Sequence, residues 1–370
     1  MSTYDVAIVG AGIVGAACAA ALAAEKLSVV IIDRDAPATG TTAAGMGHVV
    51  VMDDSEAQLA LTSYSQQRWR DLALELPESC EYQTCGTIWV AADDEEMKEA
   101  RRKRDLLASQ SIGCELLDAA AVRDAEPNLR DNITGGLLVK DDAVVYQLAA
   151  TKHLIDKAIS NGADTRFGSP ATMIDTRSLS LVNGDTISSG VVINASGALA
   201  NRLTPQLDIV PKKGHLVITD RYAAQFIKHQ VLELGYARSA HGSQADSVAF
   251  NVQPRPTGQV LIGSSRQLGK SDRIIDRDIL RRMIARAVAY MPGLAKMSAI
   301  RAWTGVRPAT KDNLPYIGEV PDLPGVFAAA GHEGLGITTS LGTAAILRDL
   351  IIGRQPAIPH TPYSPARSVA

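Results

Sequence analysis

The first apolar positions of the chain predict a strand, a helix and a second strand. Tyr4–Val9 is a short apolar run, and a glycine turn leads from it into an alanine-rich stretch that ends near Lys26. Ser28–Ile32 is a second apolar run, and Asp33 follows it directly. This order indicates an α/β fold that begins with a strand-helix-strand unit.

Later segments are predicted as helices from their composition and from the residues at their ends. They are Ser55–Leu76, Asp93–Ser111, Asp276–Met291 and Thr338–Ile352. Asp93–Ser111 opens with acidic residues and closes before Gly113, which agrees with the helix dipole. The basic run Lys98–Arg104 within it is interpreted as a solvated helix face.

Other segments are predicted as strands. Two extended runs between Ser178 and Asn194 flank Asn183-Gly184, a dipeptide suited to a tight hairpin turn. An antiparallel sheet is predicted from His215–Thr219, Val248–Gln253 and Gln259–Ser264.

Composition and charge narrow the class of protein. The 370 residues are 46% hydrophobic and 21% charged, which is typical of a globular protein of two or three domains. Lys and Arg number 37 against 40 Asp and Glu, so no positive surplus favours nucleic acid as a partner. The four cysteines are Cys18, Cys80, Cys85 and Cys114. They lack the spacing of a disulfide framework or of a metal site, so we expect the protein to lie in a reducing cytoplasm.

Val6–Ala24 carries no charge and superficially resembles a signal peptide or a membrane span. No Lys or Arg precedes it, and glycines interrupt it where a secretory apolar core is continuous. Neither a signal peptide nor a transmembrane segment is therefore expected.

The first candidate site is the turn with Gly10, Gly12 and Gly15. It follows a strand and opens a helix, and Asp33 stands 18 positions after the last glycine. In a dinucleotide-binding turn these glycines permit a tight turn, close approach to a pyrophosphate, and close packing of helix on strand. Asp33 would accept hydrogen bonds from the adenosine ribose.

This turn does not separate NAD from FAD, but a second turn near the C-terminus does. Val326–Ala330 is predicted as a strand, and Gly331–Gly336 leads from it into a helix that begins near Ile337. The N-terminus of that helix could stabilise negative charge on a reduced flavin, whereas a nicotinamide ring needs no such stabilisation.

Further motifs make the chain resemble the D-amino acid oxidase superfamily over nearly its whole length. Besides the two turns, the motifs are Gly40–Met46, Val192–Ala198, and Gly305–Asp312 continuing through Pro315 and Gly318. The resemblance is to the branch with glycine oxidase, sarcosine oxidase and the flavin subunits of heteromeric amino acid dehydrogenases.

The resemblance implies roles for individual residues. Arg307 falls where glycine oxidase binds the substrate carboxylate, in a segment from Trp303 to Pro308 that is predicted as a loop. His48 and His332 are the titratable residues expected nearest the flavin ring, and His48 is a candidate catalytic residue beside Arg307. Either histidine could orient the substrate or tune the pKa of its amine, but each is interpreted first as a hydrogen-bonded neutral histidine. No general base is assigned. The residues expected to bind FAD, without a covalent tether, are Gly10, Gly12, Ile13, Val14, Gly15, Asp33, Arg34, Thr41, Thr42, Ala44, Gly45, Met46, Ala195, Ser196, Gly197, Gly331, His332, Glu333, Gly334, Leu335, Gly336 and Ile337.

The chain departs from its relatives at positions near the expected substrate. Glycine oxidase has an aromatic hydroxyl at the position aligned with Asn251 and a second arginine at that of Gly334. Sarcosine oxidase has an oxygen-activating lysine at the position aligned with Leu261. These departures point away from glycine as substrate and weaken the case for oxygen as electron acceptor.

The resemblance implies an FAD-binding Rossmann-like domain interleaved with an α+β substrate domain. The expected FAD domain comprises residues 1–79, 140–211 and 302–370, and the substrate domain comprises 80–139 and 212–301. The expected activity is oxidation of the C–N bond of an amino acid or cyclic amino acid, of D-hydroxyproline or opine type. We expect the chain to act as the β subunit of a heteromeric dehydrogenase.

Alternatives remain open. One is a homomeric glycine, sarcosine or D-amino acid oxidase that produces hydrogen peroxide. Another is a non-catalytic scaffold subunit that keeps the fold but binds no flavin.

Overall fold

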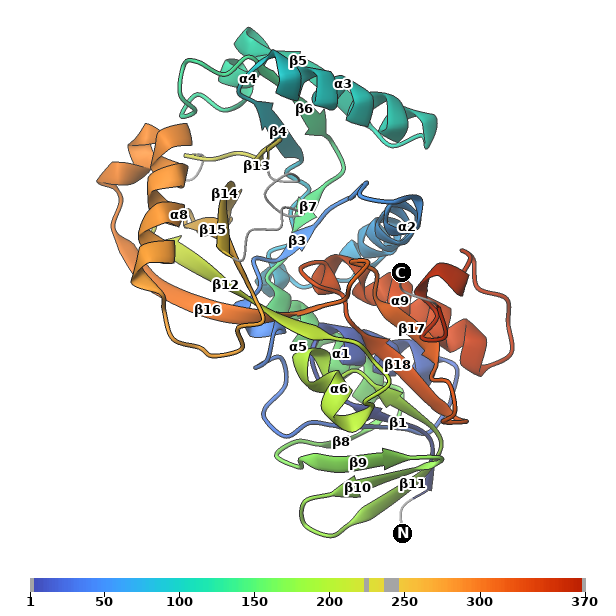
Figure 1. The fold of residues 1–370 in the computed structure, drawn as a ribbon. Helices are drawn as coiled ribbons and strands as arrows, with labels where there is room; N and C mark the ends of the chain where they lie inside the picture. The colour runs from blue at the N-terminus through green and yellow to red at the C-terminus, as the bar shows by residue number, and fades with distance from the viewer. Residues whose placement is uncertain (1–2, 223–225, 236–245, 368–370) are drawn as a thin grey trace.

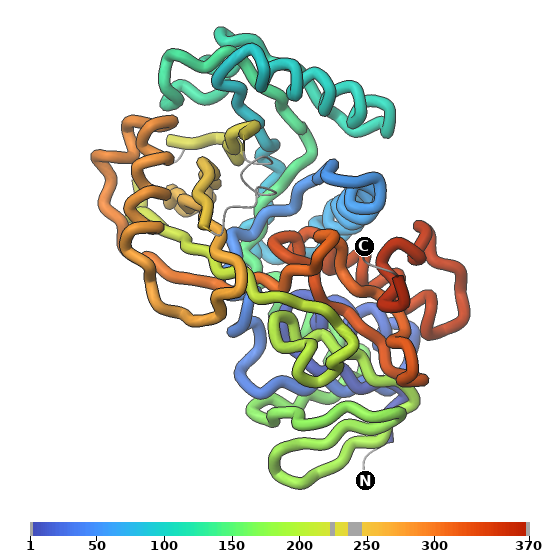
Figure 2. Tube along the Cα trace, in the orientation of Figure 1, coloured from blue at the N-terminus to red at the C-terminus, as the bar shows by residue number. Residues whose placement is uncertain are grey.

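A computed structural model describes residues 3–222, 226–235 and 246–367 of the chain. Within this part the chain forms two large sheets at opposite ends of the molecule (Figure 1). Segments far apart in sequence meet between the sheets, as the tube trace shows (Figure 2). The predicted α/β fold class with an antiparallel second sheet is confirmed.

The first sheet has a parallel centre. In spatial order its strands are β17 (Tyr316–Glu319), β18 (Val326–Ala330), β11 (Thr186–Asn194), β1 (Thr3–Val9), β2 (Val29–Ile32) and β8 (Asp164–Arg166), and β10 (Ser178–Leu181) and β9 (Ala171–Asp175) extend it beside β11. β1 lies between β2 and β11 and runs parallel to both. The predicted hairpin is confirmed as β10 and β11.

Both faces of β1 are buried, which explains its continuous apolar run. Val6 and Ile8 pack with helices α1 (Ile13–Ala24), α5 (Gln147–Ser160) and α9 (Gly336–Ile351) on one face. Ala7 and Val9 pack into a separate cluster on the other face. The alanines of α1 allow it to lie closely between the sheet and its neighbouring helices.

The second sheet is antiparallel except where β13 and β4 run parallel. Its spatial order is β16 (Ala299–Ala309), β12 (Val210–Thr219), β15 (Val260–Leu268), β14 (Asp246–Pro254), β13 (Gln230–Glu233), β4 (Thr87–Ala91), β6 (Gly135–Val139) and β5 (Cys114–Asp118). One face packs on α8 (Arg277–Tyr290), where Phe250 stacks on Tyr290 at 4.5 Å between ring centroids. Because side chains alternate along a strand, Asn251 then points to the opposite face.

The remaining elements are short or connect the sheets. They are α2 (Glu56–Ala73), α3 (Asp94–Ser109), α4 (Ala119–Ala125), α6 (Ala200–Leu203), the ribbon β3 (His48–Val49) and β7 (Ala143–Val144), and the 3₁₀ turns η1 (Thr42–Ala44), η2 (Glu78–Cys80), η3 (Gly197–Leu199), η4 (Pro292–Lys296) and η5 (Thr361–Tyr363). The predicted helices are confirmed: α2, α3 and α8 have slightly shorter bounds than predicted, and α9 begins two residues earlier than predicted. Among the described helices, none has both the length and the apolar composition needed to cross a bilayer.

The interpretation of Lys98–Arg104 as a wholly solvated face is wrong at Lys103. Its side chain is only 5% exposed and forms an ion pair with Asp53. Lys103 lies on the side of α3 that also buries Ala100 and Leu107, and its ammonium stands 5.1 Å from the ring centre of Trp89. A run of basic residues longer than one helical turn must place some of them on the inner face.

The predicted domain division stays a proposal. Its boundaries at 211/212 and 301/302 fall within β12 and β16, which are continuous strands. Parts of the proposed ranges, at 1–2, 223–225, 236–245 and 368–370, lie outside the described residues.

Asp142, just before β7, has a buried carboxyl group that contacts α2 and the segment after β3. Its Oδ1 accepts hydrogen bonds from the backbone N–H of Val51 at 3.0 Å and from the Gln66 amide at 2.8 Å. The Thr87 side chain is a further hydrogen-bonding neighbour of this carboxyl group. Burial, only partly opposed by these hydrogen bonds, raises the pKa of Asp142 to about 7.

This raised pKa predicts a pH-dependent stability. An unfolded aspartate titrates near pH 4, so the folded protein retains a proton that the unfolded chain loses between about pH 4 and pH 7. The free energy of unfolding should therefore fall as pH rises through this window, by an amount on the order of 4 kcal/mol. In Asp142→Asn the free energy of unfolding should fall much less over this pH range than in the wild type. Urea unfolding from pH 5 to pH 8 measures the difference. Equal pH dependence in wild type and variant would contradict the assignment.

Candidate active site

The glycines of the first turn allow backbones to approach closely. A Cβ on Gly10 would stand 2.4 Å from the Ala195 carbonyl oxygen, and Gly10 has a φ of +112°. A Cβ on Gly15 would stand 1.9 Å from the Gly10 carbonyl oxygen, so Gly15 lets α1 pack on the turn. Gly12 is the N-cap of α1, has no side-chain cap, and lines a large cavity.

Asp33 organises this turn through hydrogen bonds within the protein. Its Oδ2 accepts a hydrogen bond from the Ala11 N–H at 2.6 Å, and its Oδ1 accepts one from the Asp35 N–H at 2.9 Å. Each carboxylate oxygen retains capacity for another donor. Asp33 and Arg34 both line the cavity, and the ribose contact of Asp33 stays a prediction.

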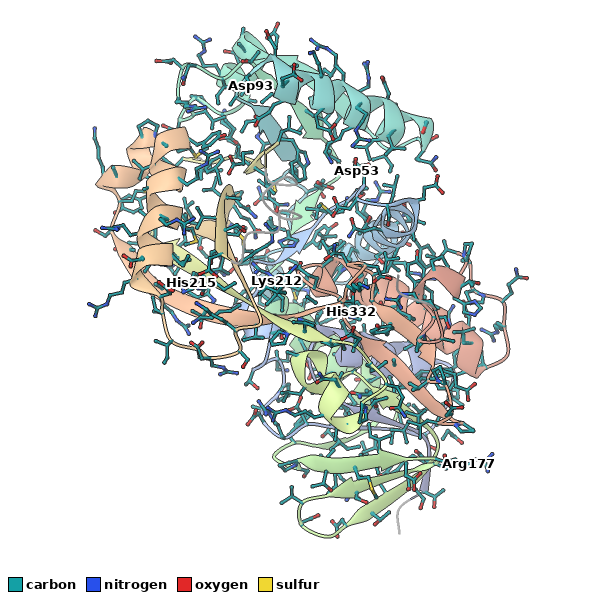
Figure 3. All side chains as sticks on the ribbon, viewed as in Figure 1. Asp53, Asp93, Arg177, Lys212, His215 and His332 are labelled. Atoms are coloured by element: carbon teal, nitrogen blue, oxygen red, sulfur yellow. The ribbon has the colours of Figure 1, made fainter. Side chains whose placement is uncertain are left out.

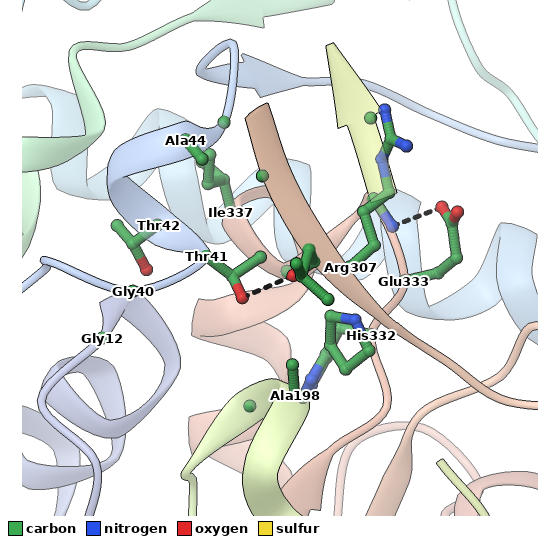
Figure 4. Close-up of a pocket in the computed structure, with 18 of the residues that line it drawn as sticks. Gly12, Gly40, Thr41, Thr42, Ala44, Ala198, Arg307, His332, Glu333 and Ile337 are labelled. Carbon is green, nitrogen blue, oxygen red and sulfur yellow. Dashed lines mark hydrogen bonds between the residues drawn. The ribbon is translucent and has the colours of Figure 1, made fainter. Parts of the chain in front are cut away.

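The segment around η1 forms the next wall of the cavity and is held by distant residues. The Thr41 hydroxyl donates to the Val306 carbonyl oxygen at 2.8 Å (Figure 4). The Gln147 and Gln253 amides donate to the carbonyl oxygens of Gly45 at 2.8 Å and Met46 at 2.7 Å, respectively. These contacts hold the segment between the two sheets.

The C-terminal turn forms the wall opposite. A Cβ on Gly331 would stand 2.6 Å from Thr310 Cγ2, and Gly331 has a φ of +83°. Helix α9 then begins at Gly336, with Leu335 as an N-cap that has no side-chain cap bond. Figure 4 shows His332, Glu333 and Ile337 around the same cavity.

The cavity has a volume of about 1100 Å³ and unites the predicted residues. Every predicted site residue except Gly15 and Gly331 lines it. Its volume exceeds the roughly 300–1000 Å³ of a typical small-molecule site. The cavity therefore has room for a large cofactor and a substrate together.

Arg307 lies on a strand, whereas the segment from Trp303 to Pro308 was predicted as a loop. It belongs to β16 and pairs with Lys212 of β12. Pro308 is tolerated because β16 is an edge strand and needs no donor on its outer side. The Arg307 Nη1 donates to the Ser265 carbonyl oxygen at 3.0 Å.

Gly214 provides the space for this arginine. A Cβ on Gly214 would stand 2.5 Å from Arg307 Nη1 and 2.9 Å from Cζ. The guanidinium therefore lies against the backbone of β12. Gly334, from the C-terminal turn, would bring its Cβ only to 3.6 Å from Arg307 Cδ, so its missing side chain leaves space on the other side.

Glu333 lies among positive charges at the same wall. It forms an ion pair with Lys212 at 3.3 Å (Figure 4). Burial alone would raise the pKa of Glu333, but Arg307, Lys212 and Arg266 outweigh this effect and hold that pKa at about 2. Glu333 is therefore ionised, and it offsets part of the positive charge around Arg307.

Both predicted histidines are hydrogen-bonded within the protein. His48 Nε2 lies 3.1 Å from the Gly334 carbonyl oxygen, and burial lowers the pKa of His48, with the charge of Arg307 contributing. His332 Nε2 lies 3.0 Å from the Thr343 hydroxyl, and burial lowers its pKa to about 3. Both rings are therefore neutral near pH 7.

The far end of the cavity includes residues that the sequence did not indicate. These residues are Trp89, Lys103 and Leu232. Asn251, which the resemblance places near the substrate, lines the cavity beside them, and its Oδ1 has no partner among the described residues. Only the strand register places these residues opposite the N-terminal segment. Leu261 does not line this cavity and packs instead with Met46 in a small apolar cluster.

The residues around the cavity fit FAD. Helices α1 and α9 both direct N-termini toward it, and neither has a side-chain cap or an acidic residue in its first turn. These ends suit a pyrophosphate and the electron-rich end of a flavin. The fold and the site together define a dinucleotide-binding flavoprotein.

Known protein families and relatives agree with this class of protein. Residues 5–350 match the family described as "DAO: FAD dependent oxidoreductase", and the chain belongs to that family. The chain is 27% identical to a glycine oxidase from Geobacillus kaustophilus, over 99% of this chain and 97% of that one. It is 26% identical to the hydrogen cyanide synthase subunit HcnC from Pseudomonas protegens, over 97% and 95% of the two chains.

Solved structures show the same fold. The crystal structure of the Geobacillus kaustophilus glycine oxidase superimposes with a TM-score of 0.90 at 26% identity, over 100% of both chains. An L-proline dehydrogenase from P. horikoshii has a TM-score of 0.88 at 21% identity, over 98% and 97% of the chains, and supports the fold alone. FAD is the cofactor, and its non-covalent attachment stays a prediction.

The position of Gly12 allows a test of where FAD binds. We expect Gly12→Leu to weaken FAD binding by on the order of 100-fold or more, because its side chain would occupy the space of the pyrophosphate. FAD content after purification, and titration of the apoprotein with FAD, measure the effect. Gly113→Leu, outside the cavity and without backbone strain, is the matched control. A Gly12→Leu protein that retains one FAD per chain would refute this placement.

Proposed function

We propose that the protein oxidises the C–N bond of an amino acid and that Arg307 binds the substrate carboxylate. The observation that carries this proposal is the position of Arg307, in a cavity wall shared with the FAD-binding turns. A planar guanidinium can hold a carboxylate with two parallel hydrogen bonds. The named activity of the glycine oxidase relatives supports an amino acid as the substrate class.

The substrate favoured by the cavity is larger than glycine. Gly334 leaves space beside Arg307, and the far end holds Trp89, Leu232 and the unpartnered Asn251 oxygen. The apolar surfaces of Trp89 and Leu232, next to the Asn251 acceptor, suit a secondary or cyclic amino acid with a donor group. D-hydroxyproline and opine-type substrates belong to this class.

The chain's own residues have a positioning task in this reaction. FAD held at the two glycine turns would supply the hydride acceptor for the substrate α carbon. Arg307 would hold the carboxylate so that the α C–H faces the cofactor. The neutral His48 and His332 add no positive charge beside the substrate amine, which must lose its proton before oxidation. Oxidation of the substrate amine would give an imine. Water would hydrolyse this imine unless it is cyclic.

For electron transfer, we favour a β subunit of a heteromeric dehydrogenase with a cytoplasmic location. The leucine at position 261, buried behind Met46, offers no cation that could assist oxygen. The second candidate is a homomeric oxidase, which the similarity to glycine oxidases favours. A non-catalytic scaffold is not proposed, because the chain belongs to a family of oxidoreductases and the cavity fits FAD.

Arg307 provides the main test of the proposed activity. We expect Arg307→Ala to retain FAD but to lower kcat/KM for amino acids at least about 30-fold, because the carboxylate loses a charged partner worth about 2–5 kcal/mol. Arg307→Lys should be intermediate, since it keeps the charge but not the paired donors. Arg281→Ala, on the exposed side of α8, is the matched control. Near-normal kinetics of an FAD-loaded Arg307→Ala protein would show that another residue binds the carboxylate.

The electron acceptor is tested separately. We expect the protein expressed with its neighbouring genes to copurify with at least one other polypeptide, and the isolated chain to produce peroxide slowly. Native mass measurement and a peroxide assay with substrate check both points. A homo-oligomer that releases peroxide rapidly would favour the oxidase alternative instead.

A further inference from the structure

His215 is a fully buried histidine in β12 that stands next to Gly214. Its Nε2 accepts a hydrogen bond from the backbone N–H of Asp276 at 3.0 Å. Its Nδ1 lies 2.9 Å from the Ser265 hydroxyl oxygen. Figure 3 shows His215 on the second sheet, away from the C-terminal turn that carries His332.

These contacts determine the tautomer of His215. An N–H can donate only to an unprotonated ring nitrogen, so Nε2 carries no proton. In the neutral ring the proton must then be on Nδ1, which donates to the Ser265 oxygen. The Asp276 N–H therefore directs the His215 proton toward Ser265.

Ser265 stands where the ladder between β12 and β15 is irregular. The regular pairing shifts between Lys213 and Val217, which spans His215. In this gap the His215 backbone N–H donates to the Ser265 hydroxyl oxygen at 2.9 Å instead of to a carbonyl group. Buried backbone groups need partners, so the Ser265 side chain takes the place of a ladder bond.

The carbonyl group of Ser265 is the acceptor for Arg307, at 3.0 Å from Nη1. His215 holds the Ser265 side chain with two donors, and Ser265 holds one end of the guanidinium. Gly214, adjacent to His215, leaves the space in which that guanidinium lies. The contacts form a continuous series from Asp276 through His215 and Ser265 to Arg307.

We propose that His215 is a positioning residue for Arg307: in its neutral form with the proton on Nδ1, it fixes Ser265, whose carbonyl group orients the guanidinium toward the substrate carboxylate. This proposal rests on the proposed function, in which Arg307 binds that carboxylate. Nothing in the reaction requires His215 to touch the substrate.

The charged groups that face His215 are consistent with a neutral ring. Burial lowers the pKa of His215, and the positive charge of Lys213 lowers it further. Asp276 and Asp272 act in the opposite direction, and Arg307 adds to the lowering. Lys213 is itself paired with Asp272 at 2.6 Å, so these two charges largely offset each other.

The test uses FAD-loaded protein and chloroacetate, a small carboxylate that lacks an amine. Its Kd is measured from the change in flavin absorption at neutral pH, together with KM and kcat for an amino acid substrate. We expect Ser265→Ala and His215→Leu each to raise the Kd about tenfold, from the loss of one hydrogen-bonded anchor. KM should rise similarly, whereas kcat at saturation should change less.

Conservative and paired variants separate positioning from general stability. His215→Asn keeps a side-chain donor at the Nδ1 position, and we expect it to keep the Kd within about threefold of wild type. In an Arg307→Lys background, Ser265→Ala should have a much smaller effect on Kd, since the residue that it positions is changed. FAD content and Tm of each variant show whether it is folded.

The outcomes distinguish this inference from the proposed function. Chloroacetate bound equally well by Arg307→Ala and wild type would overturn the proposed function and this inference together. Loss of binding in Arg307→Ala, with unchanged Kd in both Ser265→Ala and His215→Leu, would overturn only the role of His215. An equal loss in His215→Asn and His215→Leu, or a full effect of Ser265→Ala in the Arg307→Lys background, would also overturn it.

Discussion

The antiparallel pairing of β12 with β16 is the interaction on which the cavity depends. Register along this pair sets Arg307 beside Lys212 and Gly214 opposite Gly305. The same strand, β16, reaches the N-terminal segment, because Thr41 donates to the Val306 carbonyl oxygen and Trp303 donates to that of Ala44. One pair of strands therefore holds the proposed substrate anchor next to the segment expected to bind the cofactor.

Close backbone approach is the second constraint, and glycine is required where it occurs. Gly10 and Gly15 let the first turn, β11 and α1 converge, and a Cβ at either position would overlap a carbonyl oxygen. Gly305 has the same role between β16 and the N-terminal segment, since its Cβ would stand 2.5 Å from the Cβ of Ala44. A dinucleotide can reach the backbone of these turns only because no side chains intervene.

The cavity wall combines positive and negative side chains and is not a simple positive patch. Arg307, Lys212 and Arg266 surround the ionised Glu333, which reduces the net charge that a bound anion would meet. Both neighbouring histidines are neutral and are hydrogen-bonded within the protein. A carboxylate would therefore be selected by the geometry of Arg307 more than by the total charge.

The sequence by itself determined the parts of this protein that depend on local physics. The glycine turns, the apolar run of β1 and the caps of α2, α3 and α8 can be recognised because each constraint acts between residues close together in the chain. The family motifs likewise indicated FAD and Arg307. The sequence was misleading for Arg307, which was expected in a loop but lies on β16, and for Lys103, whose charge predicted exposure.

The tertiary structure decided what these local signals could not. Gly214, His215 and Ser265 have no recognisable motif, and only the interrupted register between β12 and β15 brings them to Arg307. Asn251 and Trp89 likewise reach the cavity only because the second sheet turns that face toward the N-terminal segment. The physical reason is that strand pairing joins residues far apart in sequence, and a shift of one residue would turn each side chain to the opposite face.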